Sequence, residues 1–261
     1  MEKIDLVLQG ALQPFTIQTA KIYLTLDWVN SVIISCWESC GQIVNKNPRI
    51  IILQNKDVEN GSTKNRNRQI VSSREGIKKA TTQFAYKFRS DQIIHPSSLQ
   101  EMHNFYIKHN KAKIYYEDNL LFPRNRICVG SIFTQFPFHP KDWWFLGSKE
   151  DLLEMLDIPL DPTQDNNEDY TKTVRSETYL FQFYCAKFDK KVREMVDNPQ
   201  LYLYDNAPRF SEALQKSSEI LQDVYKVMPP VHFLWPKYFG DKDVFNFKNG
   251  FDEYYHNEEL T

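Results

Sequence analysis

Residues 81–91, with the sequence TTQFAYKFRSD, restrict the possible folds of this chain more than any other stretch. Aromatic residues alternate with smaller or polar ones along it, which is the two-residue period of a strand. The pattern ends at Arg89, Ser90 and Asp91, polar residues that a buried sheet would place at its carboxyl edge. In open α/β sheets this edge is where ligands bind. A guanidinium and a carboxylate delivered there could hold a phosphate and a metal ion, although they also suit a solvated turn.

Short apolar runs upstream predict further strands of the same sheet. These runs occupy residues 4–8, 29–36 and 49–53. They are nearly continuous, as in strands that are covered on both faces. Residues 16–26 and 70–80 have the apolar spacing of helices, although Gly76 weakens the second by about 1 kcal/mol relative to alanine. The alternation of strands and helices predicts an α/β fold with a Rossmann-type, mostly parallel central sheet flanked by helices.

The second half of the chain is dominated by helical patterns. Helices are predicted at residues 98–109, 149–158, 175–196 and 210–227, and strands at 112–116 and 126–132. Residues 60–68 and 159–169 are polar, which predicts exposed loops, the second of them flexible. The aromatic segment 231–251 is expected to pack back onto the sheet.

The composition excludes several classes of protein. With a net charge of −2 and 25% charged residues, no global field attracts the chain to nucleic acid or to anionic lipid. No run of about 20 apolar residues predicts a transmembrane helix. The first residues, MEKIDLVLQG, suggest a first strand rather than a signal peptide. We therefore expect a cytoplasmic protein, in the host cytoplasm if the protein is viral, with peripheral contact to a membrane left open.

The four cysteines do not predict a metal site. Cys36 and Cys40 are spaced more widely than the usual two-residue zinc pair, and no second Cys/His pair completes four ligands. In a cytoplasmic chain, we interpret all four, including Cys128 and Cys185, as buried or half-buried thiols.

A cluster of basic residues precedes the strand at 81–91. It consists of Arg66, Arg68, Arg74, Lys78 and Lys79. Such a cluster is most often a solvated helix face. Because it lies just upstream of the predicted Asp91 edge, it also suits a cradle for phosphate.

Several motifs in a fixed order carry a family resemblance. They are IDLVLQGAL, DWVNSVIISCWES, RNRQIVSSREGIKKA with FAYKFRSD, KDWWFLGSKEDLLEMLDIPL and ETYLFQFYCAKF. Together they resemble the WavE-type proteins of lipopolysaccharide synthesis, glycosyltransferases of GT-A type, over residues 4 to about 238. Each motif alone is weak, so the order and spacing carry the resemblance. A bacterial and a viral member would look alike at this level.

The resemblance implies roles for residues that match the donor site of GT-A enzymes. They are Gln9, Gly10 and Ala11 for the nucleotide, Asn55 or Asp57 for the base, and Arg68, Arg74 and Lys78 for the diphosphate or sugar, with Arg89 and Ser90 beside them. The implied donor is a nucleotide sugar, with UDP among the candidate nucleotides.

The metal-binding D-x-D motif of such enzymes aligns on Arg89, Ser90 and Asp91, so that an arginine replaces the first carboxylate. The resemblance implies a divalent ion, Mn²⁺ or Mg²⁺, held by Asp91 and with His232 as a second ligand. One carboxylate, phosphate oxygens and water can hold Mg²⁺. Alternatively, Arg89 neutralises the diphosphate directly and makes the metal dispensable.

The resemblance also implies a base that activates the acceptor hydroxyl. We expect Glu177 in this role, as in inverting enzymes, with Asp142 as the alternative. A carboxylate in the first turn of a helix also has a purely structural explanation, because it stabilises the helix dipole. His139 and Trp143 are expected to line the acceptor site, although aromatic side chains more often belong to the core.

These expectations together describe one GT-A-like domain spanning residues 1–261, with a nucleotide-binding half at 1–95 and an acceptor half at 96–261. The acceptor would be a glycan, such as a surface polysaccharide, a lipopolysaccharide-like molecule or a viral glycan. A noncatalytic GT-A-like module that binds a glycan or a partner is the alternative function. A nucleotidyltransferase fits less well, because a glycine-rich phosphate loop is expected after the first strand and QGALQPF contains only Gly10.

Overall fold

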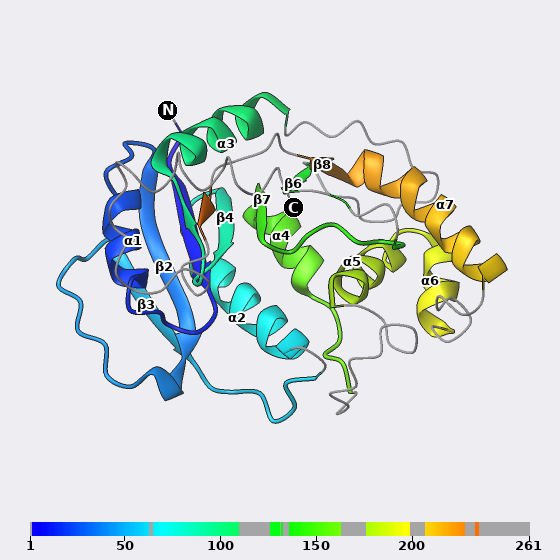
Figure 1. Cartoon of the computed structure of the whole chain (residues 1–261), viewed down its shortest axis with the longest axis horizontal. Coiled ribbons are helices and arrows are strands. Elements are labelled where there is room, and N and C mark those ends of the chain that lie inside the picture. The colour runs from blue at the N-terminus through cyan, green and yellow to red at the C-terminus, as the bar shows by residue number, and fades with distance from the viewer. Residues whose placement is uncertain are drawn as a thin grey trace, which may run out of the picture.

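The computed structural model describes residues 2–62, 65–109, 126–130, 132, 136–162, 176–198, 207–227 and 233–234. The predicted strand at 112–116 and the candidate ligand His232 lie outside the described residues, as do residues 163–169 of the predicted acidic loop. The described elements form a central sheet with helices around it (Figure 1).

The described part of the chain is built on a seven-stranded sheet with the order β3–β2–β1–β4–β7–β6–β8. Its strands are β1 (Ile4–Gln9), β2 (Val29–Trp37), β3 (Ile50–Asn55), β4 (Phe84–Arg89), β6 (Ile127–Val129), β7 (Trp144–Ser148) and β8 (Tyr225–Val227). The first four in spatial order are parallel, β7 is antiparallel to both of its neighbours, and β6 and β8 are parallel. This confirms the predicted α/β class with a mostly parallel central sheet.

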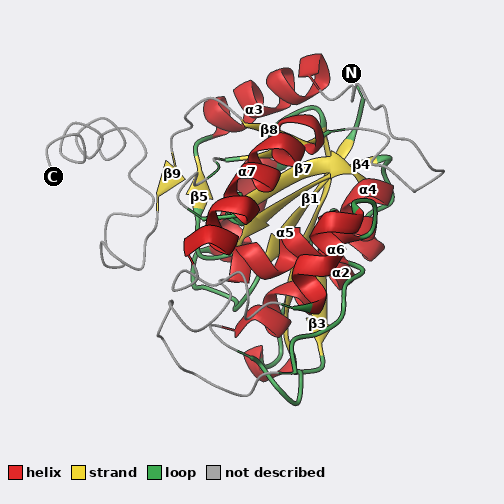
Figure 2. Cartoon of the chain, turned by 90° about the vertical axis from the view of Figure 1, so that its right-hand side faces the viewer, coloured by secondary structure: helices red, strands yellow, loops and turns green. Residues whose placement is uncertain are grey.

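Helices cover both faces of this sheet. They are α1 (Thr16–Tyr23), α2 (Arg66–Lys79), α3 (Pro96–His109), α4 (Lys149–Leu156), α5 (Ser176–Ala186), α6 (Lys190–Asp197) and α7 (Ala207–Val224), with a short 3₁₀ helix η1 (Glu38–Cys40). Leu6 and Leu8 of β1 belong to an apolar cluster shared with α1 and α3, whereas Val7 belongs to a cluster shared with α2, α4 and α5. Figure 2 shows the strands running behind the helices of the second cluster. None of the described helices is long and apolar enough to cross a membrane.

Two predicted helices end at different places from those expected. The pattern at 175–196 forms two helices, α5 and α6, because Asp189 caps the second: its carboxylate accepts a hydrogen bond from the backbone N–H of Val192 over 3.0 Å. The pattern at 210–227 forms α7, which begins at Ala207, and then β8. In the predicted aromatic C-terminal segment, the described strand β9 (Phe233–Leu234) pairs with β5 (Ile93–Ile94) instead of the central sheet.

The two predicted exposed loops are partly buried, because an ion pair joins them. Arg66, which begins α2, pairs with Asp161, and their side chains are only 5% and 4% exposed. The carboxylate of Asp161 also accepts a hydrogen bond from the hydroxyl of Ser62. The backbone of Asp161 exchanges two hydrogen bonds of 2.8 Å with the side chain of Asn67. Charged residues are buried when they are paired in this way, so the acidic composition around Asp161 was a poor guide to its exposure.

Gly76 allows α2 to lie directly against the sheet. A Cβ atom at this position would lie 2.5 Å from Cγ1 of Val7 and 3.0 Å from Cβ of Ser35. The hydroxyl of Ser35 donates to the backbone carbonyl of Ser72 over 2.7 Å, which holds the helix at this short distance. The glycine that weakens the helix pattern in the sequence is therefore required by the packing.

We expect Gly76→Ala to lower the free energy of unfolding. Alanine improves helix propensity by about 1 kcal/mol, but overpacking of a core costs about 1–3 kcal/mol, so the clash with Val7 outweighs the gain. Urea unfolding measures the difference. The control is Gly61→Ala, where the nearest atom to the new Cβ lies at 3.5 Å. A midpoint for Gly76→Ala equal to or above that of the wild type would contradict the packing argument.

A buried histidine lies between the sheet and α3. The ring of His103 stacks on Trp28, with 4.2 Å between the ring centroids, and its Nδ1 lies 2.9 Å from the hydroxyl of Tyr86. Burial lowers the pKa of His103 to about 4 from its ordinary value of 6.5. Between these two pH values the unfolded chain binds the proton and the folded chain does not. Stability is therefore lost as the pH falls from 6.5 toward 4.

His103→Phe is expected to remove part of this acid sensitivity while keeping an aromatic ring against Trp28. The wild type should lose unfolding free energy more steeply than the variant between pH 6.5 and 4, as measured by urea unfolding at several pH values. His95→Phe, at a half-buried position, serves as the control. Parallel pH profiles for the wild type and His103→Phe would show that His103 is not responsible.

Candidate functional site

A cavity of about 460 Å³ opens at the carboxyl ends of the parallel strands, in the size range of small-molecule sites. It is lined by Gln9, Gly10, Ala11, Gln13, Trp37, Ser39, Asp57, Asn65, Arg68, Gln69, Arg89, Ser90 and Asp91. Eight of these match the residues predicted for the donor and metal sites, namely Gln9, Gly10, Ala11, Asp57, Arg68, Arg89, Ser90 and Asp91. The structure thus brings together residues that are up to 82 positions apart in the chain.

The floor of the cavity is formed where β1 and β4 end side by side. Gln9 and Arg89 are partners in the parallel register. The backbone N–H of Ser90 donates to the carbonyl of Gln9 over 2.8 Å, and its hydroxyl donates to the carbonyl of Ala11 over 2.7 Å. Gly10 has a φ of +126°, and a Cβ there would lie 2.9 Å from the Ser90 hydroxyl. Glycine is therefore needed at this turn for both its conformation and its small size.

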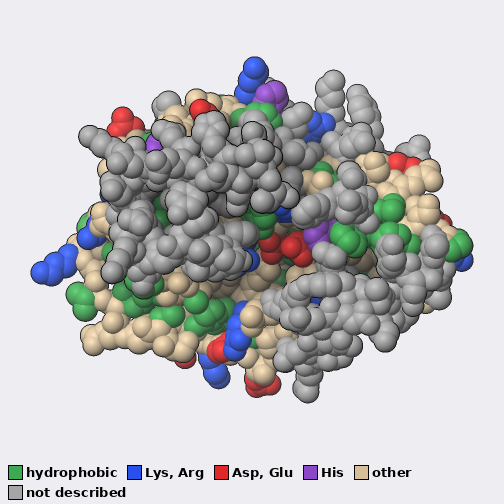
Figure 3. All heavy atoms as spheres, viewed as in Figure 1, with side chains coloured by type: hydrophobic (Ala, Val, Ile, Leu, Met, Phe, Trp, Pro, Cys, Tyr) green, Lys and Arg blue, Asp and Glu red, His purple; other side chains and the backbone are tan. Residues whose placement is uncertain are grey.

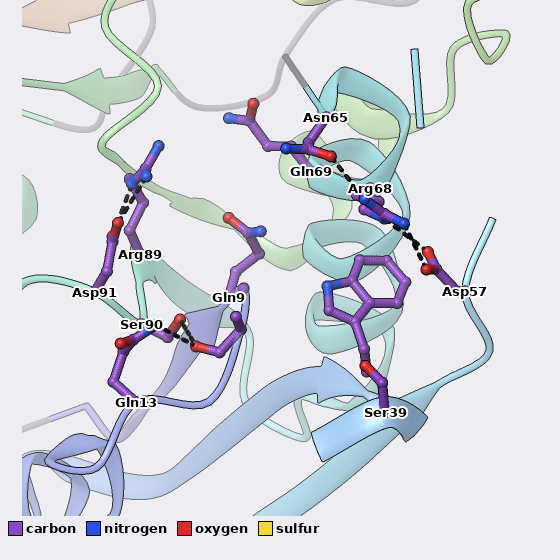
Figure 4. Close-up of a pocket in the computed structure, with 13 residues that line it drawn as sticks. Gln9, Gln13, Ser39, Asp57, Asn65, Arg68, Gln69, Arg89, Ser90 and Asp91 are labelled. Atoms are coloured by element: carbon purple, nitrogen blue, oxygen red, sulfur yellow. Dashed lines mark hydrogen bonds and ion pairs between the residues drawn. The ribbon is translucent and has the colours of Figure 1, made fainter. Parts of the chain in front are cut away.

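Two arginine–carboxylate pairs stand on opposite sides of the cavity, with Gln9 between them (Figure 4). On one side, Arg89 donates from Nε and Nη2 to the two carboxylate oxygens of Asp91 over 2.9 and 2.8 Å. On the other side, Arg68 donates to both oxygens of Asp57 over 2.8 and 2.6 Å. Hydrogen bonding to Arg68 lowers the pKa of Asp57, so this carboxylate stays ionised.

Asn55 supports the cavity from behind and does not line it. Its side-chain amide donates to the hydroxyl of Ser35 over 2.9 Å and to the carbonyl of Cys36 over 2.8 Å. The side-chain amide of Gln9 in turn donates to the hydroxyl of Ser72 on α2 over 2.9 Å. Through Ser35 and Ser72, which are hydrogen-bonded to each other, Asn55 is connected to the orientation of Gln9.

Arg74 and Lys78, two further candidates from the basic cluster, do not line the cavity. Both lie later on α2 and interact with Glu75, at 3.6 Å from Nε of Arg74 and 2.8 Å from Nζ of Lys78. Only the first part of the helix faces the cavity, through Arg68 and Gln69.

Sequence reasoning missed five of the lining residues. They are Gln13, Trp37, Ser39, Asn65 and Gln69. Trp37 is the last residue of β2 and Ser39 follows it, so the rule that ligands bind at carboxyl ends of strands would have found both. Asn65 and Gln69 lie at the start of α2, which the sequence analysis placed a few residues too late.

Asp142, the alternative base, is connected to the cavity through Gln69. The side-chain amide of Gln69 donates to the carboxylate of Asp142, which is 5% exposed. The ammonium of Lys87 donates to the backbone carbonyl of Asp142 over 2.7 Å and lies 4.6 Å from the ring centre of Phe145. Burial lowers the pKa of Lys87 to about 8, although the negative charges of Asp142, Asp91 and Glu177 act in the opposite direction.

Glu177, the expected base, lies at the start of α5 beside His139, with 3.9 Å between its Oε1 and Nε2 of the histidine. The pKa of Arg89 is raised mainly by its hydrogen bond to Asp91 and further by the charges of Asp142 and Glu177. Glu177 is therefore close enough to the Arg89 end of the cavity to act on it electrostatically. In Figure 3, acidic side chains and a histidine gather near the centre of the face shown.

The two residues expected at the acceptor site differ in exposure. His139 is 2% exposed, and its Nδ1 lies 3.3 Å from the hydroxyl of Thr178. Trp143 is partly buried, and the ammonium of Lys141 lies 3.6 Å from the centre of its ring. A sugar that stacks on this face of Trp143 would have to displace Lys141.

The residues around Asp91 do not fit a resident divalent ion. Both carboxylate oxygens of Asp91 accept hydrogen bonds from Arg89. The part of the chain that the structure describes contains no group of three histidine, cysteine or acidic side chains placed to hold a metal. The second expected ligand, His232, lies outside the described residues.

A comparison with models of protein families shows to which family the chain belongs. A family model described as WavE lipopolysaccharide synthesis matches residues 6–228. This chain belongs to that family. The match includes all thirteen residues that line the cavity, as well as Asp142 and Glu177. A search of curated proteins finds no match to the chain.

Solved structures similar to this WavE-family chain include three proteins at low sequence identity. S. aureus TarS 1–349 is 11% identical over 71% of this chain and 56% of its own, with a TM-score of 0.38. HddC from Yersinia pseudotuberculosis is 10% identical over 66% and 87%, with a TM-score of 0.37. The galactosyltransferase LgtC, with donor and acceptor sugar analogs, is 7% identical over 57% and 59%, with a TM-score of 0.35. The chain thus spans little more than half of the TarS 1–349 structure.

The buried ammonium of Lys87 is expected to make stability rise with pH. Between pH 8 and the ordinary pKa of 10.5 the unfolded chain binds more protons than the folded one, so the free energy of unfolding increases. Urea unfolding between pH 8 and 10 should show a steeper rise for the wild type than for Lys87→Met. Lys79→Met, on the exposed end of α2, is the control and should follow the wild type. If the free energy of unfolding changed with pH equally in the wild type and in Lys87→Met, the pH dependence would not be due to Lys87.

Proposed function

We propose that this protein transfers a sugar from a nucleotide-diphosphate sugar to a hydroxyl group of a glycan acceptor. The observation that carries the proposal is the cavity at the carboxyl edge of the sheet, where the β1 turn, Arg68 and Arg89 meet. Arginine is well suited to phosphate recognition, because its planar fork matches two oxygens at once. Membership in a family of lipopolysaccharide synthesis supports a glycan as the acceptor.

The nucleotide sugar would lie along the cavity between the two arginine–carboxylate pairs. All thirteen lining residues fall within 1–95, which supports the division into a nucleotide-binding half and an acceptor half at 96–261. In this arrangement the nucleobase of the donor is nearest Asp57 and Trp37, and its diphosphate reaches the end of the cavity at Arg89. Gln9, Gly10, Ala11 and Ser90 form the floor between them. UDP- and GDP-sugars are the donors to test first, and CMP-sugars, which carry a single phosphate, test whether the diphosphate is needed.

Glu177 is the proposed base that deprotonates the acceptor hydroxyl in an inverting transfer, and Asp142 is the alternative. Glu177 is the more accessible of the two, since its side chain is 26% exposed whereas Asp142 is 5% exposed and accepts a hydrogen bond from Gln69. A base has to reach the hydroxyl directly or through one water molecule. His139 and Trp143 would lie on the acceptor side of Glu177.

The divalent ion implied by the resemblance is left out of this mechanism, because the described residues around Asp91 do not fit it. The steps assigned to this chain are therefore binding of the donor, orientation of the diphosphate and removal of one proton from the acceptor. Asn55, Arg74 and Lys78 act in none of these steps by direct contact, since they do not line the cavity.

The proposal is tested by incubating the protein with UDP-, GDP- and CMP-sugars and measuring release of the nucleotide, with and without lipopolysaccharide as acceptor. Faster release of one nucleotide in the presence of acceptor is the expected result. Binding of a glycan without any donor turnover would instead identify a noncatalytic module. Binding of nucleotides can be measured separately, because a ligand at a hundred times its Kd raises stability by about 2.7 kcal/mol.

Glu177→Gln is expected to slow sugar transfer by about a hundredfold or more while donor binding stays within a fewfold of the wild type. The reason is that a general base contributes about 10²–10⁴ to the rate of the chemical step without holding the donor. Steady-state transfer assays and donor titrations give both quantities. Glu219→Gln on α7, where the carboxylate is 54% exposed, is the control. A wild-type rate of sugar transfer for Glu177→Gln, together with a reduced rate for Asp142→Asn, would show that Asp142 and not Glu177 is the catalytic base.

A further inference from the structure

By the family resemblance, Arg89 stands where a D-x-D motif would have its first carboxylate. It is the last residue of β4 and lies opposite Gln9 in the parallel register. Its side chain lines the cavity and is 33% exposed, while that of Asp91 is 16% exposed. A permanent positive charge is therefore built into the carboxyl edge of the sheet (Figure 4).

Asp91 is arranged as the partner of this arginine. Its two oxygens accept two nearly equal hydrogen bonds, from Nε over 2.9 Å and from Nη2 over 2.8 Å, which fixes the plane of the guanidinium. Such charge-assisted, bidentate bonds are about twice as strong as neutral hydrogen bonds. A divalent ion could use Asp91 only after displacing both of them.

The neighbouring carboxylates also have partners within the protein. Asp142 accepts a hydrogen bond from Gln69, and Asp57 is held by Arg68 on the opposite side of the cavity. The described residues therefore present arginine–carboxylate pairs at this cavity, and no converging set of metal ligands. This donor set suits an anion that is bound by guanidinium groups.

We propose that Arg89, oriented by Asp91, binds the diphosphate of the donor directly, so that the donor binds without a divalent ion and Asp91 is a positioning residue. This inference rests on the proposed function and specifies the chemistry of its donor site. A guanidinium has five N–H donors, and the pair with Asp91 uses one on Nε and one on Nη2, so a phosphate in the cavity would contact the other edge, formed by Nη1 and Nη2.

Other groups that line the cavity add to the attraction for phosphate. Arg68 and Gln69 lie in the first turn of α2, where the helix dipole places partial positive charge. Gln13 and Asn65 contribute side-chain amides, which can donate hydrogen bonds. The lining thus combines one arginine on each side of the cavity with side-chain amides near both of them.

The test is isothermal titration of the protein with UDP, GDP and CMP, first with EDTA and then with MnCl₂. For the nucleotide that binds, Mn²⁺ is expected to change the Kd by less than about threefold. Arg89→Ala should weaken binding by at least about tenfold in both conditions, equal to 1.4 kcal/mol. Arg89→Lys should recover only part of this loss, because lysine keeps the charge but not the fork.

The variant Asp91→Asn distinguishes between two possible roles of Asp91, orientation of Arg89 and binding of a metal ion. It removes the charge that orients Arg89, so a weaker Kd is expected in EDTA and in MnCl₂ to the same extent. The matched control is Arg209→Ala on α7, which removes an arginine that pairs with Glu212 at 3.0 Å and leaves the cavity unchanged. Thermal unfolding without nucleotide checks that each variant is folded.

Two results would overturn the inference in different ways. A gain of about tenfold or more in affinity on adding Mn²⁺, abolished by Asp91→Asn and retained by Arg89→Ala, would make Asp91 a metal ligand and leave the proposed function intact. Failure of all three nucleotides to bind under either condition would remove the donor site itself and the proposed function with it. Electron paramagnetic resonance of Mn²⁺ mixed with protein and nucleotide gives an independent readout, and the signal should equal that of Mn²⁺ with the nucleotide alone, because a diphosphate itself binds Mn²⁺ in solution.

Discussion

The parallel pairing of β1 with β4 is the constraint on which the rest of the site depends. It places the ends of two segments that are about 80 residues apart in contact, with Gln9 opposite Arg89. Ser90 then fastens the two loops through hydrogen bonds to the carbonyls of Gln9 and Ala11. Because both strands are buried on both faces, the first place where polar side chains can emerge is this shared edge.

Much of this arrangement follows from the sequence, because local patterns determine it. The strand at 81–91 and the apolar runs before it identified the parallel part of the sheet and the edge at which the cavity opens. Features that depend on contacts between residues far apart in the chain could not be predicted from the sequence. Asp161 is buried among partners that are distant in sequence, chiefly Arg66, 95 residues away, and the residues around Asp161 in the sequence do not indicate this.

In the candidate site, too, residues placed by local sequence patterns were predicted and residues placed by distant contacts were not. Residues that follow directly after a strand, such as Gly10 and Ser90, were predicted and do line the cavity, since position in the chain determines their place at the edge. Arg74 and Lys78 were chosen for their charge, but the helix turns them toward Glu75 and away from the cavity. Gln69 has no charge to draw attention, yet its position one turn earlier on α2 brings it to both the cavity and Asp142.

The close contact of α2 with the sheet at Gly76 limits how the cavity can vary. A helix seated on Val7 and Ser35 without an intervening side chain has no room to shift or rotate, and the wall formed by Arg68 and Gln69 is fixed with it. A difference in the width of the cavity would therefore have to arise away from α2, as at Ser39 in the short 3₁₀ helix η1 after β2. The α2 wall of the cavity is thus set by core packing, whereas η1 buries none of its side chains and is free of this constraint.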